Sequence, residues 1–194
     1  NENQENNENN ENKIVTEANN EVINNSETEG GETGMQDKKI LILYFSQSGN
    51  TQTVANFIHE IVGGDLVRLE TVKTYSDNYN DLLDEAQEEK NSNARPELKT
   101  NLDNIEEYDI IFLGYPNWWA DMPMPVYTFL EEYDLSQKTI VPFVTSGGSG
   151  FSNTISSIRE KQPNAIIEEG LSIYGSSAEN SKNQVEQWIN QLGF

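Results

Sequence analysis

Apolar and polar residues alternate along the chain in blocks that predict strands and helices in turn. Six apolar or aromatic residues run without a break from Ile40 to Phe45, as in a strand that is covered on both faces. Apolar positions then recur at helical spacing over residues 50–62, and Gly63 and Gly64 end that segment. This stretch therefore predicts a strand over 38–45 that leads directly into a helix.

The rest of the chain repeats this alternation. Continuous apolar runs predict buried strands over 108–116 and 138–146, and residues 65–70 alternate like a strand nearer the sheet edge. A fifth strand, open to interruption at Gly170, is predicted over 165–175. Helices are predicted over about 80–90, 123–133, 152–161 and 178–192.

Strands and helices in alternation predict an α/β fold. Buried central strands indicate one parallel sheet with helices on both faces, which is a three-layer α/β/α arrangement. Residues 71–104 are polar and predict a long excursion within one crossover. Ligands bind such sheets outside the carboxyl ends of the strands, where the strand order reverses. The loops after the first, third and fourth strands are therefore the expected site.

The first 36 residues differ in composition from the rest. Residues 1–34 contain 11 Asn, 9 Glu and one Lys but no aromatic residue, a composition that buries too little apolar surface to fold. We therefore expect a disordered Asn/Glu-rich tail over 1–36 and one domain over 37–194. The tail is a spacer or an expression remnant. Its likeness to the spacer behind a cleaved export or lipoprotein signal favours an extracytoplasmic protein over a cytoplasmic one that starts at Met35.

Charge and cysteine content exclude several functions. The formal net charge is −21, of which −13 falls in residues 35–194, and no basic cluster offers a nucleic-acid surface. The absence of cysteine excludes disulfides, thiolate metal sites and cysteine nucleophiles. No residues have the usual spacing of metal ligands, and no apolar run reaches the ~18 residues of a membrane span. An acidic domain of this kind suits a basic protein partner.

Loop one, residues 46–51 (SQSGNT), joins the first strand to its helix. The helix N-terminus offers free N–H groups and a partial positive charge, and Gly49 lets a ligand approach the backbone. The loop contains no Lys or Arg, so dipoles and hydrogen bonds alone would hold a phosphate monoester. A simple N-capping turn is the alternative. The missing Gly-Lys-Ser/Thr ending excludes a P-loop.

Loop three, residues 115–125 (YPNWWADMPMP), contains two adjacent tryptophans. Neighbours in an extended segment point in opposite directions, so at least one indole is expected to face the cleft and stack on a planar ligand. Plain packing of both is the alternative. Loop four, residues 145–151 (TSGGSGF), contains three glycines, which let backbone N–H groups approach a flat polar ligand. A flexible turn is the alternative there.

Together the three loops describe a ligand with a phosphate at one end and a flat polar ring at the other, which is FMN. The chain resembles the flavodoxin family. The stretch YFSQSGNT resembles the FMN-phosphate fingerprint, and LGYPNWWADMPMPVYTFLEEYDL and FVTSGGSGFSNTI resemble ring-binding loops of a bacterial flavodoxin-like subfamily. The resemblance runs from about Lys38 to the C-terminus. It implies a five-stranded sheet in the order 2-1-3-4-5 and tight, non-covalent FMN.

The resemblance also implies which residues bind the cofactor. Loop one would hold the phosphate, loop three would line the isoalloxazine, and loop four would border its polar edge. Many electron-transfer flavodoxins stack a tyrosine from the fourth loop on the ring, whereas this loop offers only Phe151, so a full two-sided sandwich is not expected. Asp121 is a further candidate beside the pyrimidine side. The expected cofactor-binding residues are Ser46, Gln47, Ser48, Gly49, Asn50, Thr51, Pro116, Asn117, Trp118, Trp119, Ala120, Thr145, Ser146, Gly147, Gly148, Ser149 and Gly150.

The expected function is low-potential electron transfer by a monomeric protein. An acidic surround and a partly apolar ring site should disfavour an anionic reduced flavin. The alternatives are an FMN-dependent NAD(P)H or quinone oxidoreductase of the same fold, and a non-redox module with a vestigial site. His59, the single histidine, is expected at a solvated helix position. The acidic face of the helix at 80–90 is either solvated or a docking patch for basic redox partners.

Overall fold

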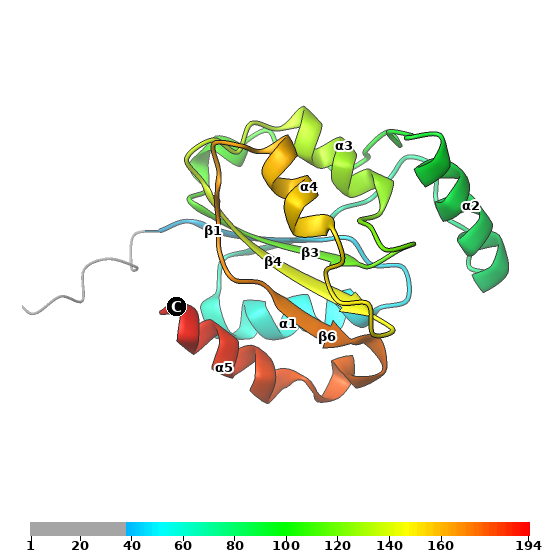
Figure 1. Ribbon diagram of the computed structural model, residues 1–194. Helices are drawn as coiled ribbons and strands as arrows, with labels where there is room; N and C mark the ends of the chain where they lie inside the picture. The colour runs from blue at the N-terminus through cyan, green and yellow to red at the C-terminus, as the bar shows by residue number, and fades with distance from the viewer. Residues whose placement is uncertain (1–37) are drawn as a thin grey trace, which may run out of the picture. The chain divides into compact units, whose positions relative to one another are not determined.

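The computed structural model describes residues 38–194 (Figure 1). The predicted tail over 1–36 lies outside the described residues, so its disorder and the extracytoplasmic location inferred from it stay predictions. None of the helices in residues 38–194 is long and apolar enough to cross a membrane.

One parallel sheet forms the centre of the domain. Its order is β2-β1-β3-β4-β5, and β6 pairs with β4 beyond the end of β5. This confirms the predicted flavodoxin-like order. The strands are β1 (Ile40–Tyr44), β2 (Asp65–Arg68), β3 (Ile110–Pro116), β4 (Thr139–Ser146), β5 (Ile166–Ile167) and β6 (Leu171–Tyr174).

Helices cover both faces of the sheet (Figure 1). One face packs against α3 and α4, and the other packs against α1 and α5. Because both faces are covered, neighbouring residues of β1 such as Leu41 and Ile42 are buried on opposite sides, which explains the continuous apolar runs. The helices are α1 (Asn50–Val62), α2 (Tyr79–Asn91), α3 (Met124–Glu132), α4 (Thr154–Lys161) and α5 (Lys182–Leu192), with the 3₁₀ helices η1 (Ile105–Glu107) and η2 (Gly175–Asn180).

The predicted fifth strand is divided at Gly170. The Phe151 ring packs so closely on Gly170 that a Cβ there would overlap it. β5 pairs with the start of β4 and β6 pairs with its end, so the two short strands share one edge of the sheet. The division therefore makes room for an aromatic side chain from the loop that follows β4.

The polar excursion carries α2 to the carboxyl end of the sheet (Figure 1). Its two ends are joined, because Val72 N donates to Glu97 O and Lys99 N donates to Glu70 O, at 2.9 and 2.8 Å. The segment between them is thus a closed loop pinned beside β2. This closure places α2 near the loops that leave β1 and β3.

Gly114 in β3 is a point at which the sheet tolerates no side chain. The Phe143 ring of β4 lies across it, and a Cβ on Gly114 would fall well inside van der Waals contact with that ring. We expect Gly114→Ala to lower the free energy of unfolding by about 2 kcal/mol or more through overpacking. Chemical denaturation measures this. Gly147→Ala is the control, because a Cβ there meets nothing within 4 Å. A second change, Phe143→Leu, should restore part of the loss, and a Gly114→Ala variant as stable as the wild type would contradict the packing.

Candidate functional site

Hydrogen bonds join the three loops at the carboxyl edge of the sheet. The hydroxyls of Thr51 and Thr145 lie 2.8 Å apart in a buried contact between loops one and four. Asn117 N in loop three donates to Thr145 O at 2.8 Å, and Asn117 Nδ2 donates to Gly150 O at 2.7 Å. The structure thus confirms that the loops meet, and it fixes two of the predicted site residues, Asn117 and Thr145, as the links between them.

Loop one presents an uncapped helix N-terminus. Gly49 is the N-cap residue of α1, with a left-handed φ of 88°, and no side chain hydrogen-bonds to the free N–H groups of the first turn. The capping-turn alternative is therefore wrong. The Ser46 hydroxyl is buried, with 3% of the residue exposed, and it has no hydrogen-bond partner. Free N–H groups beside an unpartnered buried hydroxyl are what a bound anion would satisfy.

A cation lies beside loop one although the loop itself contains none. Arg68 Nη2 donates to Ser46 O at 2.5 Å. Arg68 is the last residue of β2, and it pairs in register with Tyr44 of β1. Strand pairing brings this guanidinium to the loop from 22 residues away along the chain. That dipoles and hydrogen bonds alone hold the phosphate stays a prediction.

Loop three folds into a tight two-residue turn that separates the two indoles. Trp118 and Asp121 exchange backbone hydrogen bonds of 2.9 and 3.0 Å, and the residues between them, Trp119 and Ala120, have φ values of 54° and 60°. Two positive φ angles are the signature of a type I′ turn, which normally takes Asn-Gly. This turn is therefore strained, because Trp119 and Ala120 adopt a conformation that favours Asn and Gly.

The two tryptophans have different surroundings. Trp118 packs edge-on against Phe45 and Tyr75, with ring centroids 5.3 and 5.5 Å apart. Trp119 is 42% exposed, and its Nε1 donates to Leu83 O of α2 at 3.3 Å. Trp119 is thus not buried by packing, and the stacking of an indole on a planar ligand stays a prediction.

Neighbouring side chains hold the strained turn. The Asp121 carboxylate accepts hydrogen bonds from Met122 N and from Tyr127 OH, both at 2.8 Å. Lys90 of α2 donates to Trp119 O and lies 3.8 Å from the Asp121 carboxylate. Burial raises the pKa of Tyr127 to about 12, so its phenol remains a donor to Asp121. Asp121 thus stabilises the turn, and its contact with the pyrimidine side of the flavin stays a prediction.

Loop four is ordered by its own serine. Ser146 Oγ accepts from Gly148 N at 3.2 Å and from Gly150 N at 3.0 Å, which disfavours the flexible-turn alternative. Phe151 packs on Gly170 and not into the cleft. The exposed aromatic ring beside this loop is instead Tyr174 at the end of β6, whose Cε1 would lie 3.4 Å from a Cβ on Gly148.

A partly buried tyrosine–glutamate pair joins α2 to the segment before it. Tyr75 OH donates to Glu89 Oε2 at 2.6 Å. Burial raises the pKa of the Tyr75 phenol and also raises the pKa of the Glu89 carboxyl. Tyr75 therefore stays a neutral donor and holds its ring against Trp118.

Sequence analysis missed several residues of this edge. Arg68 reaches the site through strand register, and Tyr75 and Lys90 reach it through the excursion, which no motif covers. His59 lies in α1, away from the three loops, and is half-buried rather than fully solvated. The missed residues are Phe45, Arg68, Tyr75, Lys90, Tyr174 and Gly175. A Cβ on Gly175 would lie 2.9 Å from Asn50 Nδ2.

A sequence model of the family described as Flavodoxin matches residues 39–192. The chain belongs to the flavodoxin family. Solved structures of candidate flavoproteins from Bacteroides eggerthii and Bacteroides uniformis are each 32% identical to this flavodoxin, with TM-scores of 0.70 and 0.71. Each covers 80% of this chain, and 98% and 99% of those chains are matched.

A more distant solved structure is the flavoprotein of Lactobacillus acidophilus in complex with FMN. It is 27% identical, has a TM-score of 0.58, and the match covers 74% of this chain and 97% of that one. No curated protein sequence matches this flavodoxin significantly.

Family membership makes FMN the cofactor of this flavodoxin, and the residues present fit it. Ser46 Oγ lacks a partner and the first turn of α1 is uncapped, so both can bind the phosphate. The Cβ positions of Gly49 and Gly147 meet nothing within 4 Å, which leaves open space at both loops. The assignment of the remaining residues of loops one, three and four to FMN stays a prediction.

Ser46→Ala tests the phosphate site. Because Ser46 Oγ has no partner in the protein alone, its loss should leave the stability of FMN-free protein unchanged or slightly higher. Affinity for FMN should fall about tenfold, since a hydrogen bond to a charged phosphate is lost. Thermal unfolding and fluorescence titration with FMN measure the two effects.

Ser181→Ala is the matched control. Its buried hydroxyl donates to Ala178 O at 2.7 Å, remote from loop one. That variant should lose about 1 kcal/mol of stability and keep its FMN affinity. The assignment of Ser46 is refuted if both variants behave alike.

Proposed function

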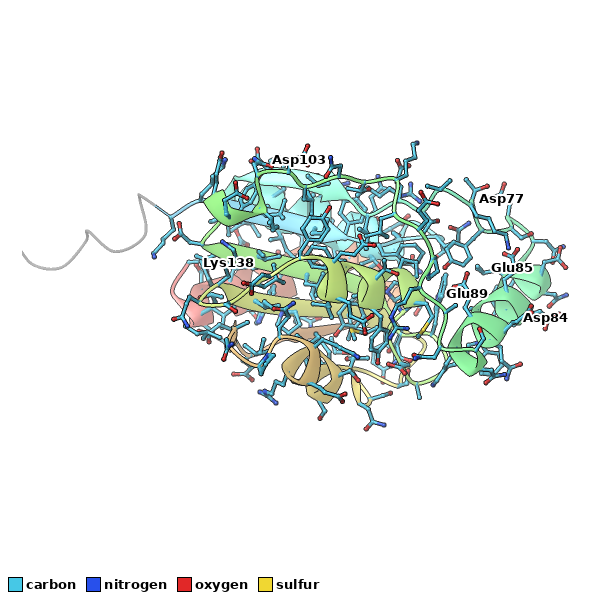
Figure 2. The ribbon with its side chains drawn as sticks, turned by 90° about the horizontal axis from the view of Figure 1, so that it is seen from above. Asp77, Asp84, Glu85, Glu89, Asp103 and Lys138 are labelled. Carbon is cyan, nitrogen blue, oxygen red and sulfur yellow. The ribbon has the colours of Figure 1, made fainter. Side chains whose placement is uncertain are left out.

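We propose that this flavodoxin is a monomeric, low-potential electron carrier that exchanges electrons with basic protein partners. The observation that carries the proposal is the acidic helix α2 beside the tryptophan turn. Figure 2 shows Asp77, Asp84, Glu85 and Glu89 gathered at this end of the domain. Negative charge here disfavours added negative charge on a reduced flavin, and so lowers the potential of its last reduction step.

The residues around the turn provide a rigid setting for the ring. FMN supplies reversible one- and two-electron chemistry when bound. Phe45 and Tyr75 fix Trp118, so one wall of the site is apolar and preorganised. Trp119 stays exposed at the surface, where an approaching protein could contact it. This combination supports electron exchange across a protein interface.

The acidic helix also bears on the nearest alternative. A nicotinamide dinucleotide carries a negatively charged pyrophosphate, which α2 would repel. An oxidoreductase acting on a neutral acceptor remains the second candidate. It is favoured by an apolar cavity of about 430 Å³ between α2 and the turn, lined by Leu82, Leu83, Trp118 and Trp119 and large enough for a small quinone.

Anaerobic redox titration of the FMN-loaded protein tests the proposed carrier. We expect two separate one-electron steps, the second at a lower potential than that of free FMN. Reduction in a single two-electron step near the free-flavin potential would refute the carrier. Rapid mixing with NADPH and with a neutral quinone completes the test, because fast flavin bleaching or reoxidation would favour the enzyme.

Charge neutralisation on α2 tests the docking of partners. Asp84 and Glu88 are exposed on α2, so Asp84→Asn with Glu88→Gln should slow electron transfer from a basic redox protein several-fold at low salt. The effect should vanish as salt screens it. Stopped-flow kinetics measure the rate.

Asp103→Asn is the control, since Asp103 is exposed at the opposite end of the sheet (Figure 2). Equal slowing by both changes would show an effect of net charge and not of a docking surface.

A further inference from the structure

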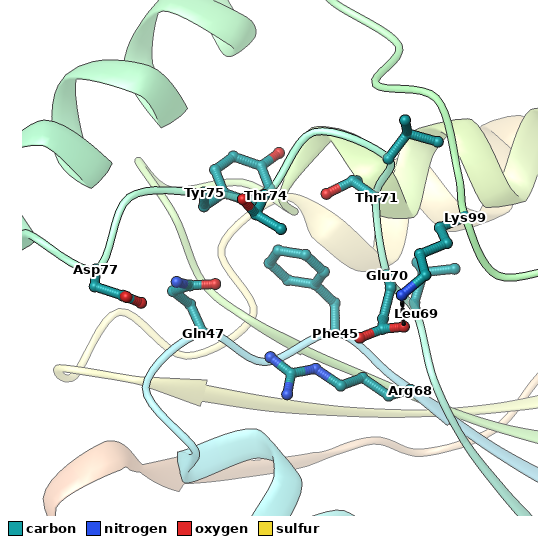
Figure 3. Close-up of a pocket in the computed structure, with 11 residues that line it drawn as sticks. Phe45, Gln47, Arg68, Leu69, Glu70, Thr71, Thr74, Tyr75, Asp77 and Lys99 are labelled. Carbon is teal, nitrogen blue, oxygen red and sulfur yellow. Dashed lines mark hydrogen bonds and ion pairs between the residues drawn. The ribbon is translucent and has the colours of Figure 1, made fainter.

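A cavity of about 510 Å³ opens beside loop one, under the segment that follows β2 (Figure 3). Its volume falls in the range of small-molecule sites. It shares Gln47 with loop one, but no residue of loops three or four lines it. The cavity therefore adjoins the FMN site without being formed by the loops expected to hold the flavin ring.

Two aromatic rings form a corner in this cavity. Phe45 and Tyr75 meet edge to face, with centroids 5.7 Å apart and ring planes at 79°. Phe45 is only 4% exposed, so a flat ring in such a corner would lie mainly against the half-buried Tyr75 and touch Phe45 only where that ring borders the cavity. Trp118 packs edge-on against Tyr75, and the Tyr75 hydroxyl donates a hydrogen bond to Glu89. These contacts fix the position of the Tyr75 ring before any ligand binds. Its shape favours a planar aromatic molecule.

The cavity also presents a guanidinium that lacks an acidic partner. Arg68 makes no ion pair with any carboxylate in the part of the chain that the structure describes, and its one hydrogen bond goes to Ser46 O. In Figure 3 its head group lies below the Phe45 ring, toward Gln47. An arginine with free N–H groups in a planar fork matches the two oxygens of a carboxylate.

The remaining charges limit how negative the ligand can be. Lys99 is already paired with Glu70 at 3.2 Å. Asp77 lines the same cavity and would repel a dianion such as a phosphate monoester. One unpaired guanidinium and one nearby carboxylate therefore suit a single negative charge.

We propose that this cavity binds a planar aromatic carboxylate beside the FMN site. The ring occupies the corner between Phe45 and Tyr75, and the carboxylate lies on Arg68. The proposal is independent of whether the flavin carries electrons singly or in pairs. It adds a second small-molecule site to the domain, next to the loop that holds the phosphate.

Calorimetric titration of the full chain with 2-naphthoate tests the site, both without FMN and after saturation with it. We expect binding in both cases, and much weaker binding of 2-naphthamide, which has the same shape without the charge. Arg68→Gln should weaken 2-naphthoate binding by ~10-fold to ~100-fold, the value of a charged hydrogen-bonded pair. Arg159→Gln, an exposed arginine on α4, should change nothing.

Asp77→Asn keeps the proposal testable if Arg68→Gln fails to fold. Asp77 is exposed, and removing its charge should tighten 2-naphthoate binding roughly two- to fivefold. Equal affinity for the amide, displacement of 2-naphthoate by FMN, or an Asp77→Asn variant that binds more weakly would each overturn the site. Because the titrations without FMN stand alone, a protein that binds no flavin would refute the proposed function without touching this inference.

Discussion

Burial of the central strands on both faces is the constraint on which the rest of the structure depends. The middle of β1, β3 and β4 is apolar, and the polar side chains of β4, Thr139, Thr145 and Ser146, lie at its two ends. Parallel pairing then brings the carboxyl ends together, where Thr51 meets Thr145 and Asn117 reaches loop four. The position of the site thus follows from the apolar core, which leaves polar side chains only at the ends of the strands.

Two features that are unfavourable to folding lie at this same edge of the sheet. Ser46 buries a hydroxyl without a partner, and Trp119 and Ala120 take left-handed conformations that suit glycine. Neither feature stabilises the protein alone. Contacts of Asp121, Tyr127 and Lys90 hold the turn, whereas the Ser46 hydroxyl has no compensating partner in the protein. Sites where local preference is overruled are where function is expected, which supports a ligand at loop one and at the turn.

The sequence predicts what is encoded locally. The bounds of α1, the division of the last strand at Gly170 and the meeting of three loops all follow from periodicity, glycine placement and parallel topology. Arg68 could not be predicted at loop one, because its position depends on the register of β2 against β1. Tyr75 could not be predicted either, since the fold of the polar excursion depends on contacts with Trp118 and Glu89 that lie far apart in sequence.

Arg68 changes the electrostatics of the site. An acidic domain that binds a phosphate needs some local compensation, and the first turn of α1 provides only partial charges. The guanidinium is fixed on Ser46 O, so it makes the electrostatic potential at loop one more positive. The acidic side chains of α2 make it more negative at the tryptophan turn. The positive end therefore favours an anion, and the negative end disfavours charge on the ring. This separation supports the proposed low-potential carrier, because an anion is favoured at loop one and negative charge is disfavoured near α2.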